Sequence, residues 1–306
     1  MGRSVTENKP TGFLLLAVLV LYKERADDSA SFRSLRHALS ENATLASFLR
    51  ILVYDNSPDA QVVPTVGIDV EYVHNPKNGG PLAAYREALE RALQSNVPWV
   101  LLLDQDTEFE GSFLEELARA ATTYVGQEEI AAIVPRLRCQ RTSISPARRR
   151  FGRSPVVIEN FSGVAPFAVT ALNSGSTMRA TFLREIAGVS SRFWLDCLDF
   201  LIFEELNRRG YKVAVCNATL QHGLSAMDPD RLMPTERYAN AKSAESLFVD
   251  FYRNALERLL YDLSLLRQYV RQKMTFKNRQ IPTITLRILK RRLLSSRKSR
   301  ILHSNS

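Results

Sequence analysis

The sequence predicts an α/β fold in which a mostly parallel central sheet is flanked by helices. Apolar, strand-like segments alternate with segments of helical periodicity through the first half of the chain, an order typical of parallel sheets covered by helices. Two of the strand-like segments end in polar residues, Asp55-Asn56-Ser57 and Asp104-Gln105-Asp106. Because ligands bind at the carboxyl ends of the strands in such sheets, we expect both sets of residues at one ligand-binding edge.

The strands of this sheet are predicted from apolar runs and from apolar–polar alternation. They cover residues 13–21, 48–57, 69–75, 98–103 and 130–135. Helices are predicted where apolar residues recur at helical spacing, at 30–41, 78–93, 111–124 and 200–209. The remaining segments are a strand and a turn at 167–178, two short strands at 211–222, and a helical region from about residue 239 onward.

One arginine-rich segment interrupts this order. Residues 136–153 hold seven arginines and no acidic residue. The segment shows no clear hydrophobic period, so we expect a mobile surface loop.

The positive charge of the chain is concentrated at one end. The 306 residues carry a net charge of +9, but Leu263 to Ser306 contains twelve Lys and Arg residues and no acid, which leaves −3 for the rest. We therefore divide the chain into a domain at 1–262 and a basic, helical C-terminal extension at 263–306. Nucleic-acid binding would be confined to this extension, and few aromatic residues accompany its charges, so no nucleic acid is expected as a partner.

The cysteines and the apolar runs point to a cytoplasmic protein. Cys139, Cys197 and Cys216 form neither a CxxC pair nor a metal-binding spacing, so we expect reduced thiols. No signal peptide is evident, and the longest apolar run spans the ten residues 13–22. A membrane-spanning helix needs about 20 residues, and we interpret this run as a buried strand.

The two aspartates after the strand at 98–103 are the strongest chemical signal. Asp104 and Asp106 are separated by one residue, and two carboxylates this close repel each other unless a cation lies beside them. Oxygen ligands of this kind suit Mg²⁺ or Mn²⁺, which then bind phosphate oxygens. The alternative is a pair of solvated acids in a turn, but the preceding apolar strand favours the metal site.

Nine short motifs, in order, resemble those of one enzyme family. They are AVLVLY (17–22), ILVYDNS (51–57), HNPKNGGPLAAYREAL (74–89), LLLDQD (101–106), LNSGSTM (172–178), RFWLDCLDF (192–200), GYKVAV (210–215), LQH (220–222) and YRN (252–254). Each motif is weak alone, but together they resemble family 2 glycosyltransferases of the GT-A fold. Within this family, residues 13–260 are most similar to bacterial rhamnosyltransferases.

The resemblance implies a metal-assisted reaction. Asp106 would hold a divalent metal, with Asp104 beside it facing the metal and the ribose of a nucleoside diphosphate sugar. His222 stands where the family places a histidine near the metal and the diphosphate, although a structural histidine is the alternative. The metal would stabilise the negative charge that develops on the leaving diphosphate.

The resemblance also implies further donor-binding residues, and each has a structural alternative. Asp55 matches the residue that contacts the nucleobase, but an Asx-type turn cap would use the same side chain. Tyr22 would stack on the base or pack in the core at a strand end. Gly79 and Gly80 would let the backbone approach the nucleotide or simply begin a helix. The turn made of Ser174, Gly175 and Ser176 would line the sugar pocket or serve only as a tight polar turn.

The acceptor hydroxyl requires a base, for which the resemblance implies Asp199. This carboxylate would take the acceptor proton while the hydroxyl attacks the anomeric carbon opposite the diphosphate, which inverts the configuration. The alternative role for Asp199 is a helix N-cap. Asp196 occurs in the rhamnosyltransferase version of the motif and would contact the donor or the acceptor sugar.

The resemblance suggests dTDP-rhamnose as the donor and a glycan or lipid-linked acceptor in surface polysaccharide synthesis. Four positions depart from the family pattern, namely Leu21, Arg86, Leu201 and Glu205, and they bear on donor identity and acceptor contacts. The basic extension is expected to hold the enzyme at the inner face of the cell membrane. Residues 285–302 are only weakly amphipathic, so attraction to anionic lipid would come mainly from charge.

Three other classes of protein remain as alternatives. A haloacid dehalogenase-type phosphatase also has an apolar strand followed by DxD, but on its first strand and followed by Gly-Thr, whereas Thr107 here precedes Glu108. A nucleic-acid-binding protein would use the basic extension. A catalytically inactive glycosyltransferase fold would bind without turnover.

Overall fold

The computed structural model describes residues 13–65, 67–68, 70–150, 153–188, 192–223, 230 and 233–303. The chain divides into two compact units. The first contains Met1–Arg149, Pro155–Leu195 and Ile202–Gly223, and the second contains Arg150–Ser154, Asp196–Leu201 and Leu224–Ser306.

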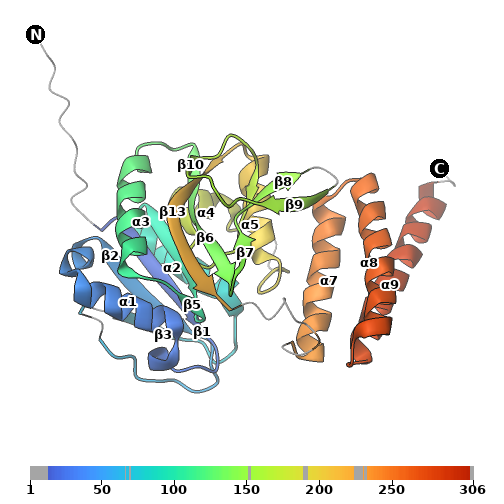
Figure 1. Cartoon of the computed structure of the whole chain (residues 1–306), viewed down its shortest axis with the longest axis horizontal. Coiled ribbons are helices and arrows are strands. Elements are labelled where there is room, and N and C mark those ends of the chain that lie inside the picture. The colour runs from blue at the N-terminus through green and yellow to red at the C-terminus, as the bar shows by residue number, and fades with distance from the viewer. Residues whose placement is uncertain are drawn as a thin grey trace, which may run out of the picture. The chain divides into compact units, whose positions relative to one another are not determined.

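The first unit is built on a mixed sheet (Figure 1). Its strands run in the order β10-β13-β6-β12-β4-β1-β2-β3. Their bounds are β1 (Leu15–Leu21), β2 (Leu49–Asp55), β3 (Val70–His74), β4 (Trp99–Asp104), β6 (Ile130–Cys139), β10 (Gly163–Val164), β12 (Thr177–Arg179) and β13 (Lys212–His222). The four strands β3, β2, β1 and β4 are parallel, whereas β12 is antiparallel to both of its neighbours.

Helices cover both faces of this sheet, as the sequence predicts. Every residue of β1 is buried, which explains its continuous apolar run. The side chains of Leu15, Ala17, Leu19 and Leu21 share a core with the apolar faces of α1 (Ala30–Glu41) and α3 (Gly111–Tyr124). The alternate residues of β1 point to the opposite face, where α2 (Gly80–Gln94) contacts β1 and β4. The α/β prediction is therefore confirmed, and the fold is of the GT-A kind.

Shorter elements complete the first unit. Two 3₁₀ turns, η1 (Ala26–Asp28) and η2 (Ala43–Ser47), flank α1, and α4 (Ala180–Ile186) follows β12. The short strand β5 (Thr107–Glu108) pairs with the end of β13. The segment 211–222 forms one strand with register shifts along β6, so the prediction of two separate strands is wrong. Its alternation is disturbed because the shift between Val215 and Thr219 displaces the side chains along the pairing.

The arginine-rich segment is not a loop in its described part. It forms the end of β6, β7 (Thr142–Ser145), β8 (Ala147–Arg150) and the start of β9 (Arg153–Val157), and β8 lies between β9 and β11 (Val169–Thr170) in a second sheet. The prediction of a mobile loop is therefore wrong, apart from residues 151 and 152, which lie outside the described residues. Backbone pairing satisfies strands this short, even where the side chains show no hydrophobic period.

The second unit consists mainly of α7 (Thr235–Tyr252), α8 (Ala255–Thr275) and α9 (Gln280–His303) (Figure 1). Asn254 and Glu257 form a capping box that fixes the start of α8. A small core joins the helices through Tyr238, Leu265, Ile281, Ile284, Ile288 and Leu289. The basic C-terminal region is helical, as predicted; side chains beyond residue 294, and residues 304–306 altogether, lie outside the described residues.

Two further points bear on the sequence-based predictions. The predicted boundary between residues 262 and 263 falls inside α8, and the division of the chain at that point stays a prediction. Over the described ranges, every helix is too short or too polar to cross a membrane.

Candidate active site

The carboxyl ends of three parallel strands form one edge of the sheet. The register pairs Leu21 of β1 with Asp55 of β2, and Val20 of β1 with Asp104 of β4. The polar residues that follow these strands therefore lie at a common edge, as the sequence predicts. Directly after β1, the backbone N–H of Tyr22 donates to Oε1 of Gln105 at 2.8 Å, which ties the end of β1 to the turn after β4.

Four of the predicted site residues meet at this edge. The hydroxyl of Ser174 donates to Oδ2 of Asp104. Nδ1 of His222 lies 3.3 Å from Oδ1 of Asp106 and 3.2 Å from Oγ1 of Thr107. The side chain of Asp106 is 48% exposed, whereas that of His222 is largely buried. The structure thus joins Asp104, Asp106 and His222 in one cluster, with the more accessible carboxylate on Asp106.

The backbone pairing between β5 and β13 builds this cluster. His222 is opposite Thr107 in the antiparallel ladder. Strand pairing therefore places the imidazole next to the turn that contains Asp104 and Asp106. Gly223 follows, and a Cβ atom there would lie 2.9 Å from Oδ2 of Asp106. A larger residue at position 223 would therefore displace the carboxylate.

The charges of the cluster interact. Burial raises the pKa of Asp104, and the negative charge of Asp106 adds to this rise, against the opposing effects of Ser174 and His222. Burial alone would lower the pKa of His222, but the hydrogen bond and charge of Asp106 outweigh it, so the pKa of the imidazole is raised. The pKa of Asp104 is affected by the charge of His222, and that of His222 by the charge of Asp104, as expected of side chains that share one site.

A third carboxylate, which sequence reasoning missed, belongs to the same neighbourhood. The pKa of Glu24 is raised by burial first and by the charge of Asp106 second, and Gln105 hydrogen-bonds to its side chain. Glu24 follows β1 by three residues and lies in no motif, so only its position just beyond a strand end pointed to it.

This concentration of negative charge fits a divalent cation. In the part of the chain that the structure describes, no group of three or more His, Cys, Asp or Glu side chains is arranged as a metal site. Mg²⁺, however, commonly uses one or two carboxylates and takes its other ligands from water and substrate phosphates. Asp104 and Asp106 supply donors of the right chemistry for a metal that is shared with a diphosphate.

Two serines that sequence reasoning also missed hold the DxD turn from behind. Ser31 is fully buried, and its hydroxyl contacts the backbone oxygen of Asp104 and, at 2.9 Å, that of Thr107. The hydroxyl of Ser29, the N-cap of α1, lies 2.9 Å from the backbone oxygen of Gln105. The first turn of α1 therefore fixes the backbone between Asp104 and Thr107. The available signal was the Ser-x-Ser spacing at the start of a predicted helix.

Asp55 is fully buried and braces the turn after β2. Its carboxylate accepts hydrogen bonds from the N–H of Ser57 at 2.9 Å, Nε2 of Gln61 at 2.8 Å and the hydroxyl of Tyr72 at 3.0 Å. Burial would raise the pKa of Asp55, but the hydrogen bonds from Ser57, Gln61 and Tyr72 outweigh it and hold the pKa below its ordinary value. The Asx-type turn is therefore present, and nucleobase contact stays a prediction.

The other predicted donor-binding residues divide by exposure. Tyr22 is 42% exposed, so it is not packed in the core, and the ammonium of Lys23 lies 5.1 Å from the centroid of its ring. Ser174 is buried, and Gly175 has φ +75°, with the side chains of Leu220 and Pro135 where a Cβ atom would lie. This turn is tightly packed, whatever it binds.

Gly79 and Gly80 begin α2, which agrees with the structural alternative for them. Gly79 is the N-cap residue. Gly80 has φ +64°, and a Cβ atom there would lie 2.5 Å from the ring of Trp194. Only glycine combines this backbone conformation with so close a contact.

Asp196 and Asp199 belong to the second unit. Asp199 is the second residue of α5 (Leu198–Arg208), and its Oδ1 accepts the N–H of Phe200 at 2.8 Å. Asp199 therefore lies in the first helical turn and not at the N-cap. In the first turn, the positive end of the helix dipole stabilises a carboxylate. Asp196 forms an ion pair with Arg237. Cys197, between them, has φ +61°, and burial is the largest of the effects that raise its thiol pKa.

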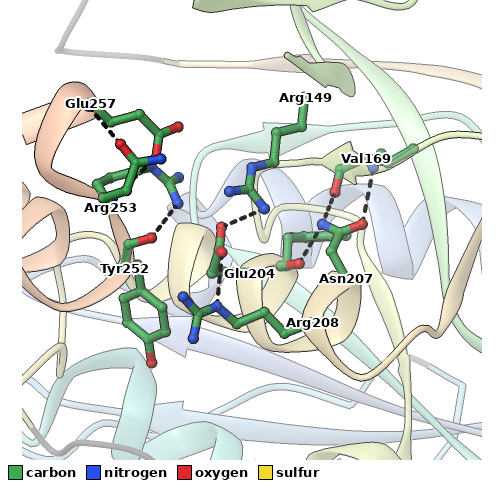
Figure 2. Close-up of polar contacts among 10 residues, drawn as sticks. Arg149, Val169, Glu204, Asn207, Arg208, Tyr252, Arg253 and Glu257 are labelled. Carbon is green, nitrogen blue, oxygen red and sulfur yellow. Dashed lines mark hydrogen bonds and ion pairs between the residues drawn. The ribbon is translucent and has the colours of Figure 1, made fainter. Parts of the chain in front are cut away.

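In the first unit, the later part of α5 is anchored by a buried carboxylate (Figure 2). Glu204 is 4% exposed and forms ion pairs of 3.1 Å with both Arg149 and Arg208. One turn further on, the amide of Asn207 bonds to the backbone of Val169 through both its Oδ1 and its Nδ2. These contacts fix α5 against β8 and β11.

Comparison with known proteins supports one class of enzyme for this chain. Residues 19–143 match the family described as Glycosyl transferase family 2. This segment spans β1 to β7 and includes Asp55, Asp104 and Asp106. The match supports a glycosyltransferase as the enzyme class. No curated protein matches the chain.

Solved structures with a similar fold include three of S. aureus TarS. The chain is 15% identical to one of them, with a TM-score of 0.48. That match covers 86% of this chain and 44% of the TarS chain. It is 14% identical to a structure of residues 1–349, with a TM-score of 0.47 and coverages of 89% of this chain and 90% of that one. It is 16% identical to TarS residues 1–349 in complex with UDP, with a TM-score of 0.46. That match covers 86% of this chain and 72% of the TarS chain.

Proposed function

We propose that this protein is an inverting, metal-dependent glycosyltransferase that uses a nucleoside diphosphate sugar. The observation that carries the proposal is the cluster of Asp104, Asp106 and His222 at the carboxyl edge of the sheet. Its two aspartates lie within the segment that matches family 2. A phosphate-binding cation suits the negative charge found there. Binding a diphosphate in turn suits a glycosyltransferase.

In this proposal, Asp106 and Asp104 hold Mg²⁺ or Mn²⁺, and His222 lies beside Asp106. The metal, when bound, supplies positive charge to the leaving diphosphate. Ser174 orients Asp104, since its hydroxyl occupies one of the two carboxylate oxygens. Ser31 keeps the DxD turn in place. Tyr22, with its exposed ring, stacks on the nucleobase, and Asp55 keeps the adjacent turn in the shape that the nucleoside needs.

Asp199 is proposed as the general base. Its carboxylate takes the proton of the acceptor hydroxyl as that oxygen attacks the anomeric carbon, and the diphosphate leaves from the opposite face. Asp196 contacts the donor or acceptor sugar in this scheme. Support comes from the motif RFWLDCLDF and from the position of Asp199 in the first turn of α5, where its charged form is stabilised.

Rhamnose from dTDP-rhamnose is the proposed donor sugar, and a glycan or lipid-linked acceptor for surface polysaccharide is the proposed acceptor. Both rest on the similarity of the motifs to bacterial rhamnosyltransferases. We further propose that residues 263–306 attach the protein peripherally to the inner face of the cell membrane, because they carry twelve basic residues and no acid.

The test is a panel of nucleoside diphosphate sugars incubated with purified protein, with Mg²⁺, with Mn²⁺ and with EDTA. We expect release of nucleoside diphosphate from one donor, dependent on metal and increased by a suitable acceptor. If no donor is turned over while a simple phosphate monoester is hydrolysed, the chain is a phosphatase and the proposal fails.

A further inference from the structure

Helix α8 carries a continuous apolar face that is exposed. Leu256, Leu259, Leu260, Leu263, Leu266, Val270 and Met274 are each between 40% and 77% exposed. Apart from the adjacent pair Leu259 and Leu260, they recur at intervals of three and four residues, which places them along one side of the helix. At 1.5 Å per residue the face is about 27 Å long. Isolated exposed apolar residues are ordinary, but a face of this length marks an interaction surface.

This face is not the surface that packs within the second unit. Leu265 and Gln272 are the buried residues of α8, and they fall on the opposite side of the helix at 100° per residue. Through these residues, α8 reaches the cluster that contains Ile281, Ile284 and Ile288 of α9. The isoleucines of α9 are therefore committed to the protein interior, whereas the leucines of α8 are not.

The charges beside the exposed face are all basic in its C-terminal half. On the helical wheel, Arg267 and Arg271 flank the face on one side and Lys273 on the other, and all three are exposed. In the described residues, no ion pair involves any of them. The acidic residues of α8 both lie in its N-terminal half, where Glu257 belongs to the capping box and Asp262 pairs with Arg292.

We infer that the apolar face of α8 lies in the surface of an anionic membrane, with its leucines among the acyl chains. An apolar face bordered by Arg and Lys is the pattern of helices that lie in the membrane interface, and anionic lipid head groups complement the basic border. A second copy of this chain is a poorer partner in a parallel contact, because such a contact would bring these basic borders together. Seven residues are also fewer than the roughly 20–30 per side of a stable protein interface.

The inference deepens the membrane association proposed above and rests on it, but it assigns the contact to different residues. Basic charge alone gives binding that salt removes, whereas inserted leucines give binding that persists in salt. A protein held in this way would meet an acceptor that itself resides in the lipid.

The test is co-sedimentation of the full chain with two kinds of vesicle. Neutral vesicles are pure phosphatidylcholine, and anionic vesicles are about 70% phosphatidylcholine and about 30% phosphatidylglycerol. The variant is Leu259→Gln/Leu263→Gln, which keeps helix-forming residues at exposed positions. The matched control is Val62→Gln, an exposed apolar residue in the first unit that is 87% exposed. Circular dichroism and donor turnover with a water-soluble acceptor show that both variants are folded.

We expect wild type and Val62→Gln to bind anionic vesicles equally and to retain part of this binding in about 0.5 M salt. Leu259→Gln/Leu263→Gln is expected to bind at least tenfold more weakly. Equal binding by the leucine variant, with wild type bound, overturns the role of α8 and leaves membrane association standing. Failure of wild type to bind overturns both. A wild-type dimer that the leucine variant converts to a monomer identifies a second copy as the partner and also overturns the inference.

Discussion

Nδ1 of His222 and Oδ1 of Asp106 lie 3.3 Å apart, although Asp106 lies near the middle of the first unit's sequence and His222 lies at its end. The antiparallel pairing of β5 with β13 brings them together, with His222 opposite Thr107. His222 is held by this strand pairing and Asp106 directly precedes the paired Thr107, so the fold sets the separation. The more exposed carboxylate is thus held beside a buried imidazole, an arrangement that suits a preorganised cation and diphosphate site.

Asp106→Ala is expected to abolish sugar transfer. The metal would lose its more accessible carboxylate, and the leaving diphosphate would lose the charge that stabilises it. Such stabilisation amounts to several kcal/mol, so turnover should fall at least about a hundredfold. Release of nucleoside diphosphate, followed with added Mg²⁺ or Mn²⁺ and then with EDTA, measures the effect.

The matched control for this change is Asp59→Ala, which removes an exposed aspartate beyond the end of β2. It should leave turnover and its metal dependence unchanged. Near wild-type turnover by Asp106→Ala, or full wild-type activity in EDTA, would contradict the metal assignment.

Asp199→Asn should preserve the fold and donor binding while transfer is lost. Asparagine has the same shape but does not accept the acceptor proton, and removing a general base lowers the rate by about 10²–10⁴-fold. Donor affinity by calorimetry and transfer rate are to be measured on the same preparation. Glu90→Gln, at an exposed position of α2, controls for the loss of one negative charge. An equal loss of donor affinity and rate would assign Asp199 to donor binding and leave Asp196 as the next candidate for the base.

Ser31→Ala should destabilise the first unit and reduce transfer without removing any group from the substrate site. The hydroxyl is buried against the backbone oxygens of Asp104 and Thr107, and buried groups that lose a partner destabilise a protein by about 1–3 kcal/mol. Urea unfolding gives the free energy. Ser40→Ala, on an exposed position of the same helix where the hydroxyl bonds only within α1, should change stability by less than about 0.5 kcal/mol. Equal stability of the two variants would remove Ser31 from this role.

Features that follow from periodicity were predictable from the sequence, and contacts distant in the chain were not. The apolar run of β1 and the polar residues after β2 and β4 place Asp55 and Asp104 at one edge because a parallel sheet leaves little choice. The serine that supports Asp104 from the start of α1 has only the Ser-x-Ser spacing as a signal, and that spacing does not identify its partner. Its role depends on which helix packs behind the strand end, and that is decided by tertiary packing.

The arginine-rich segment illustrates a second limit. Its charges gave no hydrophobic period and suggested a loop, yet Arg149 lies in β8 and pairs with the buried carboxylate of Glu204. When the partner of a charged residue lies on a helix distant in the sequence, the sequence alone predicts a solvent-exposed side chain. The amphipathic pattern of α8 was visible in principle, but which of its two apolar faces is buried depends on the position of α9.

Glu204→Gln should lower the free energy of unfolding by about 1–3 kcal/mol, as expected when charged hydrogen bonds to a buried group are lost. The carboxylate of Glu204 forms ion pairs with two arginines (Figure 2). Because both arginines retain access to water, the loss of stability should be moderate. Urea unfolding provides the measurement. Glu185→Gln, which removes an exposed carboxylate that accepts a hydrogen bond from the hydroxyl of Tyr211, is the control and should have a smaller effect. If the two variants were equally stable, Glu204 would not anchor α5.

Asp55→Asn should destabilise the protein in a way that depends on pH. The pKa of Asp55 is held below its ordinary value in the folded chain, where hydrogen bonds from Ser57, Gln61 and Tyr72 outweigh the effect of burial. A carboxyl group with a lowered pKa stabilises the folded state fully above its ordinary pKa, and this stabilisation is lost as pH falls through the folded-state value. Asparagine has no charge to lose and replaces one acceptor oxygen with a donor.

The difference in unfolding free energy between wild type and Asp55→Asn should therefore be largest near neutral pH and shrink below about pH 4. Urea unfolding of both proteins at several pH values between about 3 and 7 gives this difference directly. Asp59→Asn, an exposed aspartate four residues further along, should show no comparable difference at any pH. A constant difference for Asp55→Asn across the range would mean that the hydrogen bonds of Asp55 do not depend on its charge. The turn after β2 would then be held by shape alone, and a nucleoside bound there would not be sensitive to the ionisation of this carboxylate.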